Sequence, residues 1–267
     1  MSTLPTSRGS FGTSPSNANP HSAANSNLHG SDRPWVLLWA ALGIVGICLF
    51  ATVNALAESG KAGGDEAIQR ADVFPLESRT DRMKVVSGAD SGTSLDLKLE
   101  EADDGDAGWA LRASGLNTLM LSEAGDGGVD VVSVELVDQQ KSMTFNPPAL
   151  YLPASLKPGE SFERSGEVVI RNTSDGSVQT RGDYTQTVDP ASRQSFELPI
   201  GTREGVEVTN TVEVETDWAS VKLELITGYN GDMDNPGLIR RDMRTKITKA
   251  AFFGSTTERV LERTGDR

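Results

Sequence analysis

Apolar and polar residues alternate with a period of two along most of the chain after residue 72. In the stretch TSLDLKLEE (93–101), positions 95, 97 and 99 are leucine and the positions between them are charged. The stretches EGVEVTNTVEVETDW (204–218) and SVKLELI (220–226) repeat the pattern, with Val and Leu set against Glu, Thr and Lys. Such alternation is typical of antiparallel strands that have one buried face and one face in water.

Further stretches of the same character predict strands, and the segments rich in Gly, Asp and Asn between them predict turns. The additional strand candidates are 81–87, 108–114, 117–123, 129–137, 141–146, 161–172, 177–188, 193–200 and 243–253. The turn candidates are GADSG (88–92), DDGDAG (103–108), GDGG (125–128), NTSDG (172–176), VDPAS (188–192) and NGDMDNPG (230–237). Only STTERVLER (255–263), with Val260 and Leu261 between charged residues, reads as a short helix.

These elements predict an all-β fold, or a β-rich fold with one or two short helices, built as a large antiparallel curved sheet or half-barrel. About a dozen strands at regular spacing would form it. The stretches FPLESRTDRM from Phe74 and LPASLKPGESF from Leu152 both begin with an apolar residue and proline and lead into a strand. This likeness raises the alternative of a duplicated sheet, although proline before a strand is common in unduplicated proteins as well.

Composition divides the chain into four parts. Residues 1–34 are rich in Ser and Asn with little to bury, and we expect a disordered tail. Residues 35–57 are almost entirely apolar and predict a transmembrane helix that serves as a signal-anchor. Residues 58–72 are polar and predict a linker with one helical turn, and residues 73–267 predict an extracytoplasmic antiparallel β domain.

The apolar run 35–57 has two interpretations. Its 23 residues suffice for a helix across a bilayer of about 30 Å, with two tryptophans near one headgroup layer. Arg33 before the run and Glu58 after it favour an N-terminus inside the cell. The alternative is a signal peptide cleaved at Ala57, since Ala55-Leu56-Ala57 matches a cleavage-site pattern. We expect a single-pass anchor in the cell membrane with a periplasmic or extracellular domain, and in either case the domain leaves the cytoplasm.

The residue types that this domain lacks restrict its chemistry. Both histidines, His21 and His29, lie in the tail, and the only cysteine, Cys48, lies in the apolar run. Catalysis by Ser-His-Asp or Cys-His groups and zinc or copper sites built on these residues are therefore excluded in the exported part. The net charge of −13 argues against a nucleic-acid partner. Carboxylate chemistry, Ser-Lys chemistry, oxygen-ligated metals or no catalysis remain.

Two acidic loops are weak candidates for a calcium site, and no other cofactor is expected. Asn230, Asp232 and Asp234 stand at alternate positions of a Gly- and Pro-containing loop and offer hard oxygen ligands. The alternative is a turn closed by Asx side chains, which is common between strands. The second loop has the same two interpretations and contains Asp103, Asp104 and Asp106.

Other candidate residues concern a hydrolase site and a pocket. Acids are plentiful, but those in 204–218 fall on the wet face of a strand, and a solvated face is the preferred interpretation; these are Glu207, Glu213 and Glu215. Trp109 and Trp218 are candidates for lining a ligand pocket. Since Trp218 has the parity of Val212 and Val214, packing in the core is expected first.

One basic cluster stands out in this acidic domain. It consists of Arg240, Arg241, Arg244, Lys246 and Lys249. It could meet an anionic partner or headgroup, but we expect local charge balance against Asp232 and Asp234.

Three stretches of the chain resemble a known group of proteins. DVFPLESRTDRMKV (72–85), LPASLKPGESFERSGEV (152–168) and ITKAAFFGSTTERVLER (247–263) resemble uncharacterised bacterial exported β-sheet proteins. Those proteins are similar to the antiparallel half-barrel of periplasmic lipoprotein carriers of the LolA and LppX type. The resemblance implies a concave sheet that holds an apolar ligand, and it implies no catalytic residues.

The sequence therefore predicts a membrane-anchored extracytoplasmic β domain that binds a lipid or another apolar ligand and does not catalyse a reaction. Its partners would be the bilayer, through 35–57, and an apolar ligand or an envelope protein. One alternative is a structural or protein-interaction module of the cell envelope. A second alternative is a carboxylate-based hydrolase.

Overall fold

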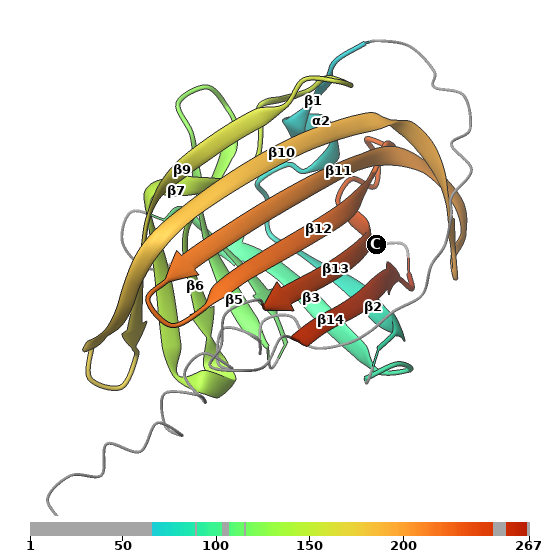
Figure 1. The fold of residues 1–267 in the computed structure, drawn as a ribbon. Helices are drawn as coiled ribbons and strands as arrows, with labels where there is room; N and C mark the ends of the chain where they lie inside the picture. The colour runs from blue at the N-terminus through green and yellow to red at the C-terminus, as the bar shows by residue number, and fades with distance from the viewer. Residues whose placement is uncertain (1–65, 89, 103–106, 115, 248–254, 266–267) are drawn as a thin grey trace, which may run out of the picture. The chain divides into compact units, whose positions relative to one another are not determined.

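The computed structural model of the protein describes residues 66–88, 90–102, 107–114, 116–247 and 255–265. In these residues twelve strands form one closed antiparallel barrel (Figure 1). The strands are β2 (Arg79–Ser87), β3 (Ser94–Glu101), β4 (Trp109–Ala113), β5 (Asn117–Glu123), β6 (Val129–Leu136), β7 (Lys141–Leu152), β9 (Phe162–Asn172), β10 (Val178–Leu198), β11 (Gly201–Thr216), β12 (Ser220–Asn230), β13 (Leu238–Ile247) and β14 (Ser255–Arg263). Each pairs with the next barrel strand along the chain, and β14 pairs with β2.

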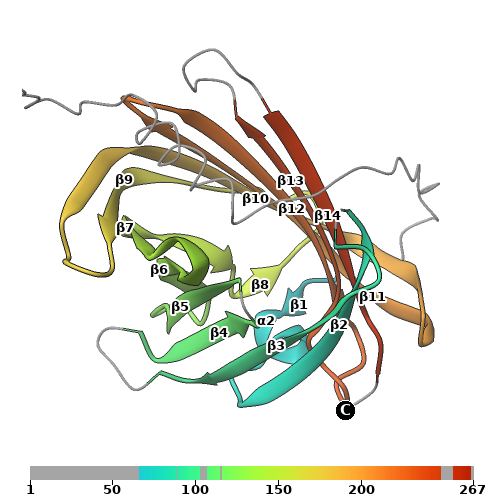
Figure 2. The ribbon, with the colours of Figure 1, turned by 90° about the horizontal axis from the view of Figure 1, so that it is seen from below.

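Three short elements lie inside the ring of strands, as Figure 2 shows: β1 (Ile68–Gln69), α2 (Arg70–Val73) and β8 (Ser155–Leu156). Together they are the inner segment. β1 pairs with β8 through Ile68 opposite Leu156, and both residues are buried. A single 3₁₀ turn, η1 (Val137–Gln139), follows β6. The prediction of an all-β antiparallel fold is confirmed.

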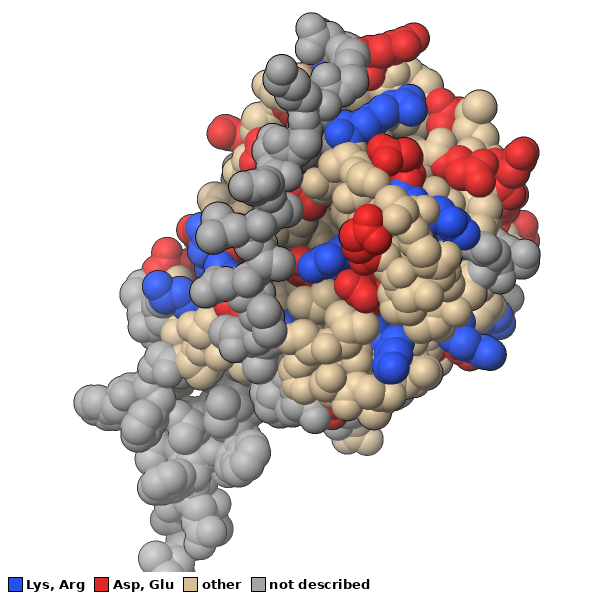
Figure 3. All heavy atoms as spheres, turned by 90° about the vertical axis from the view of Figure 1, so that its right-hand side faces the viewer, with Lys and Arg blue, Asp and Glu red and all other residues tan. Residues whose placement is uncertain are grey.

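The alternation of the sequence matches the two faces of the barrel wall. On β11, Val206, Val208 and Val214 are buried in the interior, while Glu213 and Glu215 on either side of Val214 are exposed. Lys222 on β12 pairs with Glu213 at 2.7 Å on the outer face. Acidic and basic side chains are interspersed over the face of the molecule seen in Figure 3. The interpretation of these glutamates as a solvated strand face is confirmed.

The prediction of a half-barrel is wrong in one respect, because the sheet closes completely. β14 pairs with β2 through Leu261 opposite Val85 and Arg263 opposite Met83. An Arg263 Nη2 atom lies 3.1 Å from Asp81 Oδ1 across this seam, and both side chains are buried. The seam joins residues more than 170 positions apart, so local alternation could not reveal it.

Two local predictions are corrected. Residues 255–263 form the strand β14 and not a helix, because Arg259, Leu261 and Arg263 alternate inward and pairing with β13 and β2 decides the conformation. The expected turn VDPAS (188–192) lies within β10, which runs on to Leu198. The register with β11 shifts between Pro190 and Arg193, and pairing with β9 ends at Val188. A bulge beyond the neighbouring strand tolerates a residue without an N–H group.

The strands divide into two runs of six, β2–β7 and β9–β14, and one of the paired short strands precedes each run. The duplication itself stays a prediction. The tail 1–34, the apolar run 35–57 and the linker up to residue 65 lie outside the described residues. Among the residues that are described, no helix is long and apolar enough to cross a membrane.

Candidate functional site: an apolar cavity inside the barrel

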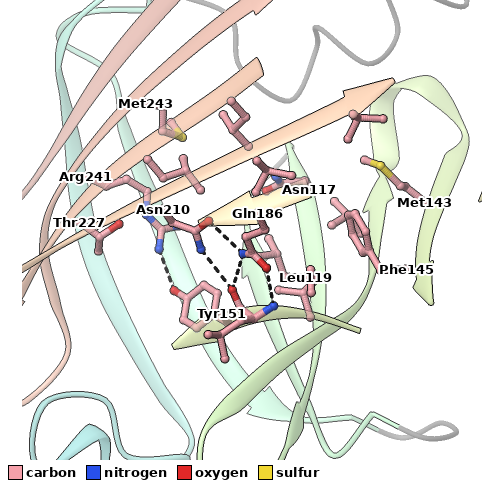
Figure 4. Close-up of a pocket in the computed structure, with 18 of the residues that line it drawn as sticks. Asn117, Leu119, Met143, Phe145, Tyr151, Gln186, Asn210, Thr227, Arg241 and Met243 are labelled. Atoms are coloured by element: carbon pink, nitrogen blue, oxygen red, sulfur yellow. Dashed lines mark hydrogen bonds between the residues drawn. The ribbon is translucent and has the colours of Figure 1, made fainter. Parts of the chain in front are cut away.

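The barrel contains a cavity of about 140 Å³. A single buried water needs roughly 10–15 Å³ by a comparable measure, and an apolar cavity of roughly 150 Å³ can hold a molecule such as benzene. The lining comes from inward positions of β5, β6, β7, β10, β11, β12 and β13, and most of it is Val, Leu, Met and Phe (Figure 4). Such a space suits an apolar ligand better than ordered water.

The inner segment closes one end of the cavity. The ring of Phe74, directly after α2, packs against Tyr151 at 5.2 Å between centroids and against Tyr229 at 5.8 Å. Both tyrosines line the cavity, and all three residues are buried. The lining extends from this floor to Val214 and Val221, next to the β11–β12 turn. The cavity therefore runs along the strands toward the barrel end opposite the floor.

Three inward residues that line the cavity are less covered than those at the floor, whereas Val214, Val221 and Thr245 farther along are buried. Val206 and Tyr229 are 1% and 2% exposed, whereas Val212, Leu223 and Met243 are half-buried although they point inward. Side chains of this size in a filled barrel would be buried completely. The interior is thus packed at the inner segment and less filled around Val212, Leu223 and Met243.

A first polar group in the wall is fully satisfied. Gln186 of β10 accepts a hydrogen bond from the Leu150 N–H at 2.7 Å and donates to the Leu150 carbonyl at 2.6 Å. It also donates to Asn210 Oδ1 at 2.9 Å, and Asn210 donates to the same carbonyl at 3.2 Å (Figure 4). The two amides hold the backbone of β7 where it crosses the barrel, so their role is structural.

A second polar group is not satisfied in this way. Arg241 of β13 lines the cavity and is 8% exposed, and its Nη2 donates to the Tyr151 hydroxyl at 2.7 Å (Figure 4). Its Nε is buried and meets no hydrogen-bond acceptor among the described residues. The described lining contains no Asp or Glu, so no carboxylate of the wall neutralises this charge.

The charge on Arg241 persists in spite of its burial. Burial lowers the pKa of Arg241, but the adjacent Tyr151 and Tyr229 raise it by more, so the pKa lies above its ordinary value. Burial, first of all, and the neighbouring Tyr151 hold the pKa of Tyr229 well above 10. At neutral pH the floor therefore combines the guanidinium cation of Arg241 with the protonated phenol of Tyr229.

Thr245 stands on the same face of β13, four residues beyond Arg241. It is 1% exposed, and its Oγ1 has no hydrogen-bond partner among the described residues. At about 3.4 Å per residue the two side chains are roughly 14 Å apart along the strand. The cavity wall thus carries a cation at the floor and a lone hydroxyl farther along.

The two tryptophans proposed for a pocket do not line this cavity. Trp109 is half-buried on β4 and packs against the core. The expectation that Trp218 packs in the core is wrong, since it is 51% exposed in the β11–β12 turn. β11 ends at Thr216, whose Oγ1 accepts the N–H groups of Trp218 and Ala219, so the strand parity does not reach position 218.

The loop proposed for calcium is closed by its own hydrogen bonds. Asn230 Oδ1 accepts the Asp232 N–H at 3.3 Å, and Asp232 Oδ1 accepts the Asp234 N–H at 3.0 Å. Asn230 Nδ2 donates to the Asn235 carbonyl at 2.7 Å. The interpretation as an Asx turn is confirmed, and the described residues contain no group of three or more His, Cys, Asp or Glu side chains that could hold a metal ion. Residues 103–106, with the second acidic loop, lie outside the described part.

The basic cluster is divided between the two faces of β13. Arg240 pairs on the outer face with Asp242 at 3.2 Å and with Glu262 at 3.4 Å, while Arg244 pairs with Glu258 at 2.6 Å. The expected balance against Asp232 and Asp234 is wrong for both arginines, and Lys249 lies outside the described residues. Arg241, the cation that the sequence grouped with its neighbours, faces inward. Its parity with Met243, Thr245 and Ile247 is the signal that could have identified it.

Comparisons with known proteins give little. No protein-family model matches the sequence, and no curated protein matches it. One solved structure is similar, the crystal structure of a presumed lipoprotein from Parabacteroides distasonis. It shares 12% identity, the match covers 73% of this chain and 97% of that one, and the TM-score is 0.34. A likeness at this TM-score carries no argument, and the relation to LolA and LppX stays a prediction.

Proposed function

We propose that the barrel binds a lipid or another apolar ligand in its interior cavity and catalyses no reaction. The observation that carries the proposal is the unfilled, apolar middle of the barrel above a packed floor. Empty apolar volume in a core costs stability, about 24 cal/mol per Å³ in a well-studied case. A ligand that occupied the space would recover that cost.

The composition of the cavity wall favours binding over catalysis. Among the described residues the wall includes no Asp, Glu, Lys or Ser, so it offers neither a carboxylate pair nor a Ser-Lys pair. Its polar members are amides, threonines, tyrosines and one arginine, which position a ligand without a proton-transfer group that titrates near neutral pH.

The proposal includes the expected setting of the domain. The apolar run 35–57 would tether the barrel to the outer face of the cell membrane, with cleavage at Ala57 as the alternative. The ligand would then be exchanged in the cell envelope. Ligand binding in the cavity requires neither a membrane anchor at 35–57 nor a particular orientation of the chain in the membrane.

Native mass spectrometry of the full chain, released from micelles of a non-ionic detergent, tests the proposal. We expect a discrete adduct of one ligand per chain, identified after solvent extraction. In Val212→Trp, a bulky ring replaces a half-buried cavity residue, and the adduct should be lost. Thr211→Trp places the same ring on the outer face of β11 and is the matched control.

An adduct lost in Val212→Trp and kept in Thr211→Trp would support binding in the cavity. Loss in both variants or in neither would place the adduct elsewhere. A bare protein mass, with no uptake from an added envelope lipid extract, would refute the proposal.

Exposed apolar side chains favour a second candidate, a protein-interaction module of the envelope. Val137, Val178 and Trp218 are 59%, 41% and 51% exposed, and they lie at three turns at the same end of the barrel. A photoreactive residue at position 218 of the full chain would test this in intact cells. One discrete protein adduct would favour the protein-interaction module. The absence of an adduct would favour ligand binding in the cavity.

A further inference from the structure

We propose that the ligand is an amphiphile with a carboxylate headgroup, of the fatty-acid class, and that its headgroup binds Arg241 at the floor of the cavity. The inference deepens the proposed function and rests on it. It starts from the unsatisfied side of the Arg241 guanidinium: Nη2 reaches Tyr151, while the buried Nε meets no acceptor among the described residues.

The donors at the floor match a carboxylate. A guanidinium has five N–H groups in a fixed fork, and a carboxylate accepts two of them side by side. The phenol of Tyr151, which accepts from Arg241, has its own O–H to donate. Thr227 of β12 stands directly opposite Arg241 in the β12–β13 pair and also lines the cavity, so its hydroxyl belongs to the same region.

Charge favours an anion with a single negative charge. A buried cation without a counter-ion carries a desolvation penalty, and the described wall has no acid to offset it. One carboxylate would neutralise one guanidinium. A phosphate monoester carries about −1.5 to −2 at neutral pH and would leave part of its charge uncompensated in apolar surroundings.

The geometry also fixes the direction of the ligand. Phe74 and the inner segment close the space behind Tyr151 and Tyr229. From Arg241 the apolar wall extends past Met243 to the level of Val214 and Val221. The headgroup therefore lies at the floor, and the first carbons of the tail lie along β11 and β12. A space of about 140 Å³ cannot hold a twelve-carbon tail, so its far end would extend past Val214 and Val221 toward the opposite end of the barrel.

The test measures the affinity of the full chain, freed of copurified lipid in non-ionic detergent, for twelve-carbon probes at pH 7.5. Dodecanoate, dodecanol, dodecyl phosphate and dodecylammonium share a tail and differ in headgroup. Charge-assisted hydrogen bonds contribute about 1.5–3 kcal/mol, so dodecanoate should bind about ten- to a hundredfold more tightly than dodecanol. Dodecylammonium should bind least, because it would meet a like charge.

Variants then assign the effect to one side chain. Arg241→Gln should weaken dodecanoate by about tenfold or more and leave dodecanol nearly unchanged. Arg240→Gln removes the neighbouring charge from the outer face and is the matched control, with no effect on either probe. Arg241→Lys keeps the charge and loses the fork, so an intermediate affinity is expected, and it replaces the glutamine variant if that one does not fold.

The outcomes separate this inference from the proposed function. If dodecanoate and dodecanol bind equally and Val212→Trp blocks both, the cavity binds apolar tails and the headgroup inference fails. If dodecyl phosphate binds best, the carboxylate assignment fails while an anion site at Arg241 stands. If no probe binds, or if Val212→Trp changes nothing, the proposed function itself fails.

Discussion

Arg241 is a residue at which the demands of folding and of the proposed ligand binding differ. It stands at an inward position between apolar neighbours on β13, and its guanidinium is buried with only phenols as described partners. Placing a cation there costs free energy that an apolar side chain of similar length would not. A residue kept for function is expected to carry such a cost.

We expect Arg241→Met to raise the stability of the ligand-free protein by about 1 kcal/mol, because the buried charge is removed and the flexible thioether fills the same space. Urea denaturation of lipid-free protein measures this. Arg240→Met on the outer face, which loses two partly exposed ion pairs, should change stability by about 0.5 kcal/mol or less, and downward. A loss of about 3 kcal/mol or more in Arg241→Met would show instead that this arginine is part of the structural core.

At the level of elements, β10 and β11 extend beyond their neighbours and carry a second, smaller core on the outer face. It contains Phe196, Leu198 and Ile239. The ring of Phe196 lies over Gly205 and Gly228, where an added Cβ would come within 3.1 Å and 2.7 Å of it. The glycines in the neighbouring strands therefore make room for the aromatic ring of this hairpin.

Gly228→Ala should destabilise the protein by about 1–3 kcal/mol, because the new methyl group displaces the Phe196 ring. The double variant with Phe196→Leu should recover part of the loss, and the coupling measured by a double-mutant cycle reports the contact. Gly108→Ala, where a Cβ would meet nothing within 4 Å, is the control. Equal stabilities of the two alanine variants would contradict the proposed packing.

The sequence predicts a strand best where the alternation of apolar and polar residues within that strand is sufficient to identify it. The alternation in 93–101 and 204–226 predicted β3, β11 and β12 together with their inner and outer faces. The prediction is wrong where a distant partner decides the conformation. The charge pattern of β14 alone indicates a helix, but pairing with β13 and β2 makes it a strand. The continuation of β10 past Pro190 has the same origin, since it depends on where β9 ends.

The candidate site was harder to predict than the strands. Alternation indicated that the Val and Leu residues of β11 and β12 face one side, but it could not tell a filled interior from a cavity, which depends on strand number and on the inner segment. Arg241 was grouped with its sequence neighbours because the predicted strand began at Met243. Had that strand been extended back to Leu238, period two would have separated Arg241 from Arg240.

On the scale of the whole molecule, the ionisation of buried tyrosines makes the stability of the barrel depend on pH. Burial raises the pKa of Tyr184 and raises that of Tyr229 well above its ordinary 10. A raised pKa means that the folded state keeps its proton when the unfolded chain has lost it. The stability these residues contribute is therefore complete below pH 10 and is lost as the pH rises through their raised values.

We expect the midpoint of urea unfolding to fall steeply above about pH 10, with the phenolate absorbance of Tyr229 appearing together with unfolding and not before it. Tyr229→Phe should flatten this dependence because the most strongly shifted group is gone. Burial lowers the pKa of Lys141, which acts in the opposite direction, but this contribution is common to both proteins and cancels in the comparison. If the phenolate absorbance that Tyr229→Phe removes appeared near pH 10 in the folded protein, water would have free access to Tyr229, and the sealed floor on which the proposed binding of a carboxylate depends would not exist.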